Sequence, residues 1–235
     1  MPTCFLDRFV VILLDLNGTF MFGQDRFGEG EDFGATYRDL GGARLDPMAV
    51  ERIVRTTYDR MALDYENPAK FDDFPRVAEV LRSLHPSLPD DELERLEEVV
   101  AVHELGHVPD SYAAGLKGLA RNHRLGLVAN IWCRKERWLR ELTRAGVLDL
   151  LEFPVFSSDH RSMKPSPRLF DLAWSRFGVG KEQTVFIGDS LVNDIAGAQA
   201  FGLASVWVNP GGPPTYNPLS ADHVVSDLHD LWNGS

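Results

Sequence analysis

Two aspartates each follow an apolar run that predicts a buried β-strand. Asp15 comes directly after Phe9–Leu14, and Asp189 comes directly after the run 185–188. The carboxyl ends of parallel strands meet at one edge of a sheet, so these two carboxylates share a crevice if their strands are neighbours. Asp194 follows five residues after Asp189, across a turn that opens a helix. Carboxylate oxygens grouped beside helix N-termini suit Mg²⁺, which binds few protein carboxylates together with waters and phosphate.

Each of these residues also has an ordinary structural explanation. Asp15 and Asp194 stand where a helix cap or turn residue is equally at home. Lys164, between Met163 and Pro165, precedes a predicted helix, where its ammonium group would balance a phosphate and an ionised aspartate. Most lysines instead lie on the solvated surface. The four residues together favour a phosphate and metal site more strongly than any one of them alone.

The elements that must position these residues alternate along most of the chain. Apolar runs predict strands and 3.6-residue periodicity predicts helices, which together indicate a right-handed parallel α/β sheet sandwiched by helices. The expected strands are 9–14, 125–129, 153–156, 184–187 and 204–208, the expected helices are 111–121, 135–145, 167–177 and 193–201, and a short closing element is expected around 222–232.

The segment 21–109 differs from the rest because it shows helical periodicity without strand signals. Its glycine-rich beginning, 23–42, is interpreted mostly as loop. Three helices are expected after it, starting at Asp46–Pro47, after Asp73 and near Asp90. We therefore expect an α/β core of 1–20 and 110–235, with 21–109 as a smaller all-helical cap over the carboxyl end of the first strand.

Composition excludes several classes of protein. The 235 residues are 44% hydrophobic and 25% charged, as in ordinary globular chains, and the formal net charge of −11 argues against nucleic-acid binding. The apolar run 9–14 is too short to cross a bilayer and lacks signal-peptide flanks. Two cysteines, Cys4 and Cys133, cannot build a disulfide framework and fit a reducing cytoplasm. We expect a cytoplasmic monomer or homodimer without a membrane partner.

Four motifs occur in a fixed order along nearly the whole chain. They are Asp-x-Asn-Gly-Thr at 15–19, Val-Ala-Asn at 128–130, Lys-Pro-x-Pro-x-x-Phe at 164–170 and Gly-Asp-Ser-x-x-Asn-Asp at 188–194. Each motif alone is a weak signal, but the ordered set resembles the haloacid dehalogenase-like hydrolase superfamily. The resemblance is to members with a helical cap inserted after the first motif, and it implies a Rossmann-like core.

The resemblance also implies roles for individual residues. Asp15 would be the nucleophile and form an aspartyl-phosphate intermediate. Mg²⁺ would be held by the side chains of Asp15 and Asp189 and by the backbone carbonyl of Asn17. Asp194 would not bind the metal directly but would orient the metal's waters or Lys164. Lys164 would offset charge between nucleophile and phosphoryl group, and the residues expected to bind the phosphate of a small phosphorylated substrate are Thr19, Ala129, Asn130 and Lys164.

Two positions depart from the phosphatase members of this superfamily. Asn17 replaces a second aspartate that acts as general acid and base, and Ala129 replaces a serine or threonine. An amide cannot transfer a proton, and such transfer contributes about 10²–10⁴-fold to a rate. The lost hydroxyl removes a hydrogen bond of about 0.5–1.5 kcal/mol.

Three interpretations of Asn17 remain open. The substrate can have a leaving group that needs little protonation, such as an acyl or aryl phosphate. A cap residue such as Asp25, Glu29 or a histidine can supply the proton, or the protein can bind a phosphorylated ligand with little turnover. Dehalogenase relatives also lack the second aspartate but attack carbon without a metal, whereas the motif 188–194 favours a metal here.

One further motif belongs to different chemistry. His103-Glu104-Leu-Gly-His107 matches the H-E-x-x-H pattern of zinc metalloproteases. Gly106 weakens that helix, Pro109 lies two residues past the second histidine, and the extended form of the motif is absent. The competing interpretation is a hinge between cap and core with His103 on an apolar face. The function expected from the sequence is therefore a Mg²⁺-dependent hydrolase, and the zinc protease ranks last.

Overall fold

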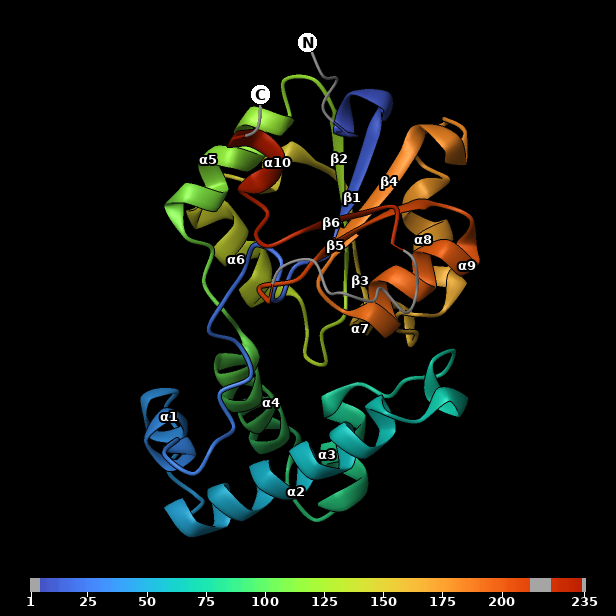
Figure 1. Cartoon of the computed structure of the whole chain (residues 1–235). Coiled ribbons are helices and arrows are strands. Elements are labelled where there is room, and N and C mark those ends of the chain that lie inside the picture. The colour runs from blue at the N-terminus through green and yellow to red at the C-terminus, as the bar shows by residue number, and fades with distance from the viewer. Residues whose placement is uncertain (1–4, 212–220, 234–235) are drawn as a thin grey trace.

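The computed structural model describes residues 5–211 and 221–233, and within them six parallel strands form one sheet (Figure 1). The strand order is β3-β2-β1-β4-β5-β6. Strand β1 starts at Val11 rather than at 9, and β6 adds a strand within the closing element expected near the C-terminus. The strands are β1 (Val11–Leu14), β2 (Arg124–Ala129), β3 (Leu151–Phe156), β4 (Thr184–Gly188), β5 (Ala204–Val208) and β6 (His223–Val225).

Strand β1 is buried on both faces, which explains its uninterrupted apolar sequence. Val11 and Leu13 point into one cluster with the helices α8 (Pro167–Trp174) and α9 (Gly197–Phe201). Ile12 and Leu14 point into the other cluster, with α5 (Asp110–Leu119) and α6 (Glu136–Arg144). The two pairs of helices flank the sheet in Figure 1, so the predicted α/β sandwich is confirmed.

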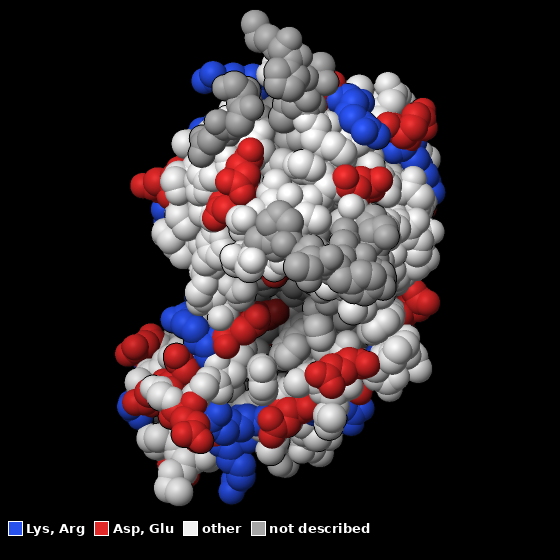
Figure 2. Space-filling view, in the orientation of Figure 1, with Lys and Arg blue, Asp and Glu red and all other residues white. Residues whose placement is uncertain are grey.

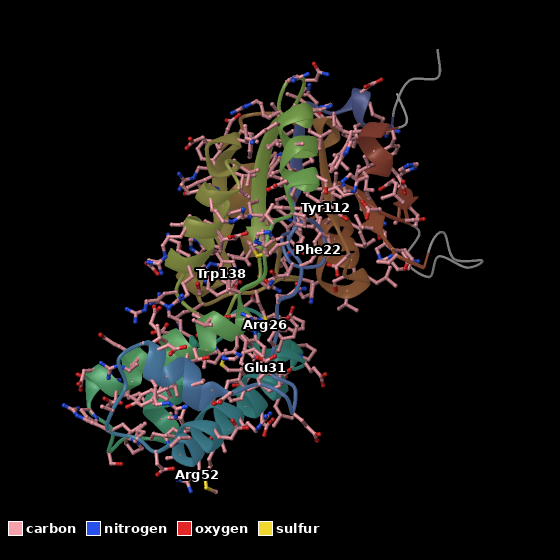
Figure 3. The ribbon with its side chains drawn as sticks, turned by 90° about the vertical axis from the view of Figure 1, so that its left-hand side faces the viewer. Phe22, Arg26, Glu31, Arg52, Tyr112 and Trp138 are labelled. Carbon is pink, nitrogen blue, oxygen red and sulfur yellow. The ribbon has the colours of Figure 1, made fainter. Side chains whose placement is uncertain are left out.

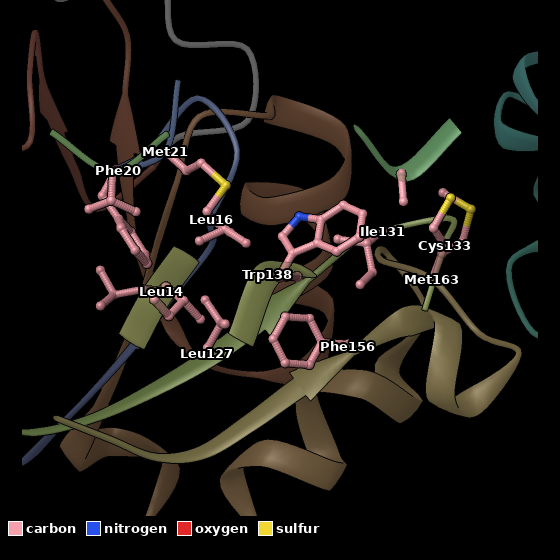
Figure 4. Packing of buried hydrophobic residues seen from close by; sticks show 14 of the residues in the cluster. Leu14, Leu16, Phe20, Met21, Leu127, Ile131, Cys133, Trp138, Phe156 and Met163 are labelled. Atoms are coloured by element: carbon pink, nitrogen blue, oxygen red, sulfur yellow. The ribbon is translucent and has the colours of Figure 1, made fainter. Parts of the chain in front are cut away.

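The second face of the sheet carries the larger cluster. Trp138 of α6 is fully buried there and packs among Leu127, Ile131 and Phe156 (Figure 4). Helix α10 (Asp230–Asn233) covers the same side beside α5, where the ring of Trp232 occupies the space above Gly115. Short elements complete the core, namely α7 (Ser157–His160) and the 3-10 turns Phe5–Arg8, Leu148–Leu150 and Lys181–Gln183.

The remaining helices pack together beyond the carboxyl ends of the strands (Figure 1). They are α1 (Phe33–Asp39), α2 (Pro47–Tyr65), α3 (Val77–Leu84) and α4 (Asp90–Glu104), with a 3-10 turn at Pro68–Lys70. As the sequence predicted, the Asp46 side chain caps α2 by accepting a hydrogen bond from Ala49 N, and α4 begins with acidic residues. We keep 21–109 as the proposed extent of the cap.

The stretch 23–42, interpreted mostly as loop, also contains the helix α1, which the sequence did not predict. Asp32 caps this helix by accepting a hydrogen bond from Ala35 N, and Phe33 and Tyr37 bury their rings in the helical part. Tertiary packing of these aromatic rings outweighs the glycines around them, which a local pattern cannot show.

The chain crosses between the two parts at neighbouring points. Phe22 N donates to His107 O at 2.9 Å, and His107 N donates to Phe22 O at 2.8 Å. Gly106 lies so close that an added Cβ would be 2.8 Å from Phe22 O. In Figure 3 Phe22 lies beside Tyr112 of α5, and their ring centroids are 4.8 Å apart.

Two further observations concern bilayer-spanning helices and the cysteines. None of the helices in the described ranges is both long and apolar enough to span a bilayer. Cys133 is buried and free, and Cys4 lies outside the described residues.

Candidate active site

The two strand-end aspartates lie where the strand order reverses. Strand β1 is hydrogen-bonded to both β2 and β4, and Leu14 pairs with Ile187. Asp15 N donates to Ile187 O at 2.8 Å, which holds the first residue after β1 against the end of β4. Ligands of open α/β sheets bind in the crevice at this reversal. Asp15 and Asp189 therefore reach the same crevice, as the sequence predicted.

Three carboxylates come together in this crevice. Asp15, Asp189 and Asp194 each offer an oxygen, and these atoms all lie within 4.8 Å of one another, a grouping found at one place in the described ranges. Lys164 Nζ lies 2.5 Å from Asp15 Oδ1 and 2.7 Å from Asp194 Oδ1. Asp15, Lys164 and Asp194 are all buried. Four residues that are remote in sequence thus form one charged cluster.

The charges of this cluster are unbalanced. Burial raises the pKa of Asp15 and raises the pKa values of Asp189 and Asp194 to about 6. Burial alone would lower the pKa of Lys164, but Asp15 and Asp194 together raise it above its usual value. One ammonium group faces three carboxylates, so the oxygen-rich site fits a divalent cation such as Mg²⁺. Gly18, at φ 76°, leaves the room that the Asp189 carboxylate fills, because a Cβ there would collide with it.

Backbone groups hold the Asp194 carboxylate of the cluster in place. Ser190 N donates to Asp194 Oδ2 at 2.9 Å, and a Cβ on Gly188 would overlap the same carboxylate. The segment expected as a helix over 193–201 begins instead as a π-helical turn, η5 (Leu191–Ala196), and continues as α9. Such turns are frequent at functional sites, and here it carries Asn193 and Asp194.

Asn130 holds the lysine segment against the end of β2. Its Oδ1 accepts from Lys164 N at 2.8 Å, and its Nδ2 donates to Lys164 O at 3.2 Å. This pair of hydrogen bonds fixes the backbone from which Lys164 reaches Asp15.

The other predicted residues take different positions. Asn17 lines the cavity beside Asp15, and its buried Oδ1 accepts no hydrogen bond from any described residue. Thr19 is buried and donates to Asp15 Oδ2 at 3.3 Å. Ala129 is fully buried, and neither Thr19 nor Ala129 is among the described residues that line the cavity.

The cluster opens into a cavity of about 390 Å³ between the sheet and the cap helices. Figure 2 shows a hollow between the two parts of the molecule, bordered by acidic side chains. The described lining residues come from both parts: Asp15, Asn17, Asn130, Trp132, Lys164, Asp189, Ser190, Asn193 and Asp194 from core segments, and Gln24, Asp25, Tyr58, Ala62, Tyr65, Glu66 and Glu104 from the cap and its first crossing.

The comparisons with known proteins point to one superfamily. A family model described as HAD-hydrolase-like matches residues 162–231. A phosphoserine phosphatase from Thermus thermophilus is 34% identical over 92 residues, 39% of this chain and 37% of that protein. An (S)-2-haloacid dehalogenase from Burkholderia cepacia is 28% identical over 134 residues, 56% of each chain. The chain thus matches between about a third and a half of the length of these curated relatives.

A solved structure extends the likeness to nearly the whole chain. A HAD phosphatase from Thermococcus onnurineus is 25% identical, with a TM-score of 0.61 over 95% of this chain and 96% of that one. The chain belongs to the haloacid dehalogenase-like (HAD) hydrolase superfamily. Its relatives include both phosphatases and dehalogenases, so membership by itself leaves the reaction open.

The cap side of this HAD cavity contains residues that the sequence did not single out. Tyr65, the last residue of α2, accepts hydrogen bonds at its hydroxyl from Asn193 Nδ2 at 2.9 Å and Asn130 Nδ2 at 3.3 Å. Burial raises the pKa of Tyr65 to about 12. On the core side, Trp207 of β5, which is not among the described residues lining the cavity, donates from Nε1 to Asp189 O at 2.9 Å. Tyr65 continues the apolar stripe of α2, and this periodicity is the one sequence signal that could have pointed to it.

The structure also shows which candidate proton donors of the cap line the cavity. Asp25 lines the cavity, whereas Glu29 is exposed and lies outside its lining, and none of the described histidines lines it. Asp25 keeps an exposed surface, and its partial withdrawal from solvent raises its pKa to about 6. Of the named candidates, Asp25 is the one on the cavity wall.

The H-E-x-x-H segment does not form a zinc site. Helix α4 ends at Glu104, so the two histidines do not share a helical face. His103 is buried, with Nε2 2.9 Å from Thr36 Oγ1, while His107 Nδ1 lies 3.1 Å from Glu141 Oε1. Glu104 accepts hydrogen bonds from Trp132 N and Cys133 N. The segment connects α4 to α5, and its role as a hinge between cap and core stays a prediction.

Proposed function

We propose that this HAD member is a Mg²⁺-dependent phosphatase of a small phosphorylated metabolite, acting through an aspartyl-phosphate at Asp15. The observation that carries the proposal is the group of carboxylate oxygens within 4.8 Å, with Lys164 bound to two of the carboxylates. Asp15, Asp189 and the backbone carbonyl of Asn17 would hold the metal. When bound, Mg²⁺ would neutralise phosphoryl charge.

The chain's own residues then account for the transfer. A carboxylate oxygen of Asp15 attacks phosphorus, the ester P–O bond breaks, and its electron pair leaves with the alcohol oxygen. The ammonium group of Lys164 lies against Asp15 and balances the negative charge that gathers between nucleophile and phosphoryl group. Water then cleaves the aspartyl-phosphate and regenerates Asp15. The cap helices exclude bulk water from the cavity during these steps.

Asp189 and Asp194 favour this function over dehalogenation. A metal-free attack on carbon gains nothing from a second carboxylate beside the nucleophile, because the repulsion by Asp189 raises the pKa of Asp15. The alternative is a protein that binds a phosphorylated ligand with little turnover, which Asn17 and Ala129 would favour. The cytoplasmic location and the monomeric or homodimeric state stay predictions.

Phosphate release from a panel of phosphate monoesters tests the proposal. With Mg²⁺, we expect turnover that EDTA abolishes and that Asp15→Asn lowers by about 10³-fold or more, since the nucleophile is gone. Asp59→Asn removes an exposed carboxylate of α2 outside the cavity lining and serves as the matched control. A flat panel together with thermal stabilisation by phosphate esters would contradict the phosphatase and support the binding protein.

A further inference from the structure

The cap side of the cavity carries negative charge without a matching cation. Asp25, Glu66 and Glu104 line it, and Lys164 is the one Lys or Arg among the described lining residues. Lys164 is already bound to Asp15 and Asp194 at the opposite, catalytic side. The sequence of 212–220, outside the described residues, contains no Lys, Arg or His.

These carboxylates differ in how they are held. Both oxygens of Glu104 accept backbone N–H groups, from Trp132 at 2.5 Å and Cys133 at 3.1 Å. Asp25 and Glu66 form no ion pair with any residue in the described part of the chain. Burial raises the pKa of Glu104 to about 8, and the charge of Asp25 adds to this. A positive group entering here would relieve both the repulsion and the missing solvation.

Three aromatic rings line the same cavity, two from helix α2 and one from the loop after β2. Tyr58, Tyr65 and Trp132 all line the cavity, and the Trp132 ring centroid lies 5.6 Å from that of Tyr58 and 5.9 Å from that of Tyr65. Aromatic faces attract organic cations, and quaternary ammonium groups are recognised by aromatic walls of this kind. A metal ion would instead need a shell of oxygen ligands, so the rings select an organic cation.

We infer that the cap side of the cavity binds an ammonium group, so that the substrate is a phosphate monoester of an amino alcohol or a quaternary ammonium alcohol. The inference rests on the proposed phosphatase function. The phosphate occupies the side of Asp15, Lys164 and Asn130, and the cationic end of the leaving alcohol meets Asp25, Glu66 and the ring of Trp132. A second anionic group on the substrate would face these carboxylates and be repelled.

Two esters of the same shape test the charge preference. Phosphocholine carries a trimethylammonium group, and 3,3-dimethylbutyl phosphate carries an uncharged tert-butyl group in its place. We expect kcat/KM with Mg²⁺ to be about tenfold or more higher for phosphocholine, the size that one cation–aromatic contact with a carboxylate nearby supports. The phosphate ester of 3-hydroxypropanoate, which adds a negative charge, should be the poorest of the three.

Two variants test whether Asp25 and Trp132 cause the preference for the cationic ester. Asp25→Asn keeps the shape and tolerates the positive φ of 56° at this position, and Trp132→Leu removes a ring. Each should lower the ratio of the two kcat/KM values by about threefold or more toward 1, while Asp59→Asn on α2 should leave the ratio unchanged. If Asp25 only supplied a proton, Asp25→Asn would slow both alkyl esters equally and preserve the ratio.

Binding separates this inference from the proposed function. Calorimetric Kd values for the two esters, measured with Mg²⁺ on Asp15→Asn, need no turnover. Tighter binding of phosphocholine without hydrolysis of either ester by the unaltered protein would support the cation site and reject the phosphatase. Equal Kd and kcat/KM values for both esters, or a ratio that survives both variants, would overturn the cation site while phosphate release still stands.

Discussion

At the scale of single residues, Asn17 limits proton transfer in the proposed reaction. Its side chain lines the cavity beside Asp15, and its buried Oδ1 accepts no hydrogen bond from a described residue. Asn17→Asp is nearly isosteric and introduces a group that protonates a leaving alkoxide. We expect kcat for an alkyl phosphate to rise on the order of 10²-fold, measured as phosphate release.

An aryl phosphate provides the internal control for this variant. Its leaving group needs little protonation, so Asn17→Asp should change its turnover far less than that of the alkyl ester. An unchanged rate for the alkyl phosphate would show that the missing carboxylate is not the defect. The proton would then come from elsewhere, and Asp25 is the carboxylate on the cavity wall that was named for it.

The residue scale also shows what the sequence can predict of the site. Asp15 and Asp189 follow apolar strands, so the strand-end rule places them together once their strands are neighbours. Trp132 and Tyr65 enter the cavity through the packing of α2 and the loop after β2, which leaves no mark at short range. Local sequence pattern therefore predicts the residues of the proposed catalytic side, whereas it does not predict those of the proposed alcohol side.

At the scale of elements, the paired crossings depend on a glycine. A Cβ on Gly106 would lie 2.8 Å from both Phe22 O and Met21 Cγ, so Gly106→Ala must push the two crossings apart. We expect the free energy of unfolding, measured in urea, to fall by about 1–3 kcal/mol. Gly118→Ala in α5 meets nothing within 4 Å and should instead raise it by about 0.5–1 kcal/mol. Equal effects of the two variants would contradict this account.

Elements were predicted well where the sheet buries them and less well elsewhere. Strand β5 has the predicted bounds, because an apolar run between turns leaves few alternatives. Helix α1 was missed because its stability comes from the burial of Phe33 and Tyr37 rather than from local propensity. The π-helical turn η5 was predicted as ordinary helix, because its extra residue follows from the geometry around Asp194.

At the scale of the whole molecule, one buried cluster joins the two parts. It runs from Leu14 and Trp138 at the sheet through Met21 at the crossing to Val50 and Leu96 among the cap helices. We expect a single cooperative unfolding transition, with the two parts reporting the same midpoint by different spectroscopic probes. Two separate midpoints would show that the cap helices unfold independently.

Trp138 tests how much of this stability comes from the core. Trp138→Ala should lower the free energy of unfolding by about 3–5 kcal/mol, because it leaves a cavity under α6. The indole Nε1 has no hydrogen-bond partner among the described residues, so Trp138→Phe loses no such bond and should lower stability less. Equilibrium urea denaturation of both variants provides the comparison. Equal losses would show that ring volume is not what matters at this position.

The pairing of Phe22 with His107 has a consequence for how such proteins change. The helices from α1 to α4 are attached where two neighbouring backbone segments exchange hydrogen bonds, so their removal leaves ends that a short turn can rejoin. The attachment is a single splice point, and the sheet with its charged cluster lies entirely on one side of it. Under the proposed function, recombination at this point would exchange Asp25 and Glu66, which face the alcohol, and would keep Trp132 and the residues that bind the phosphate.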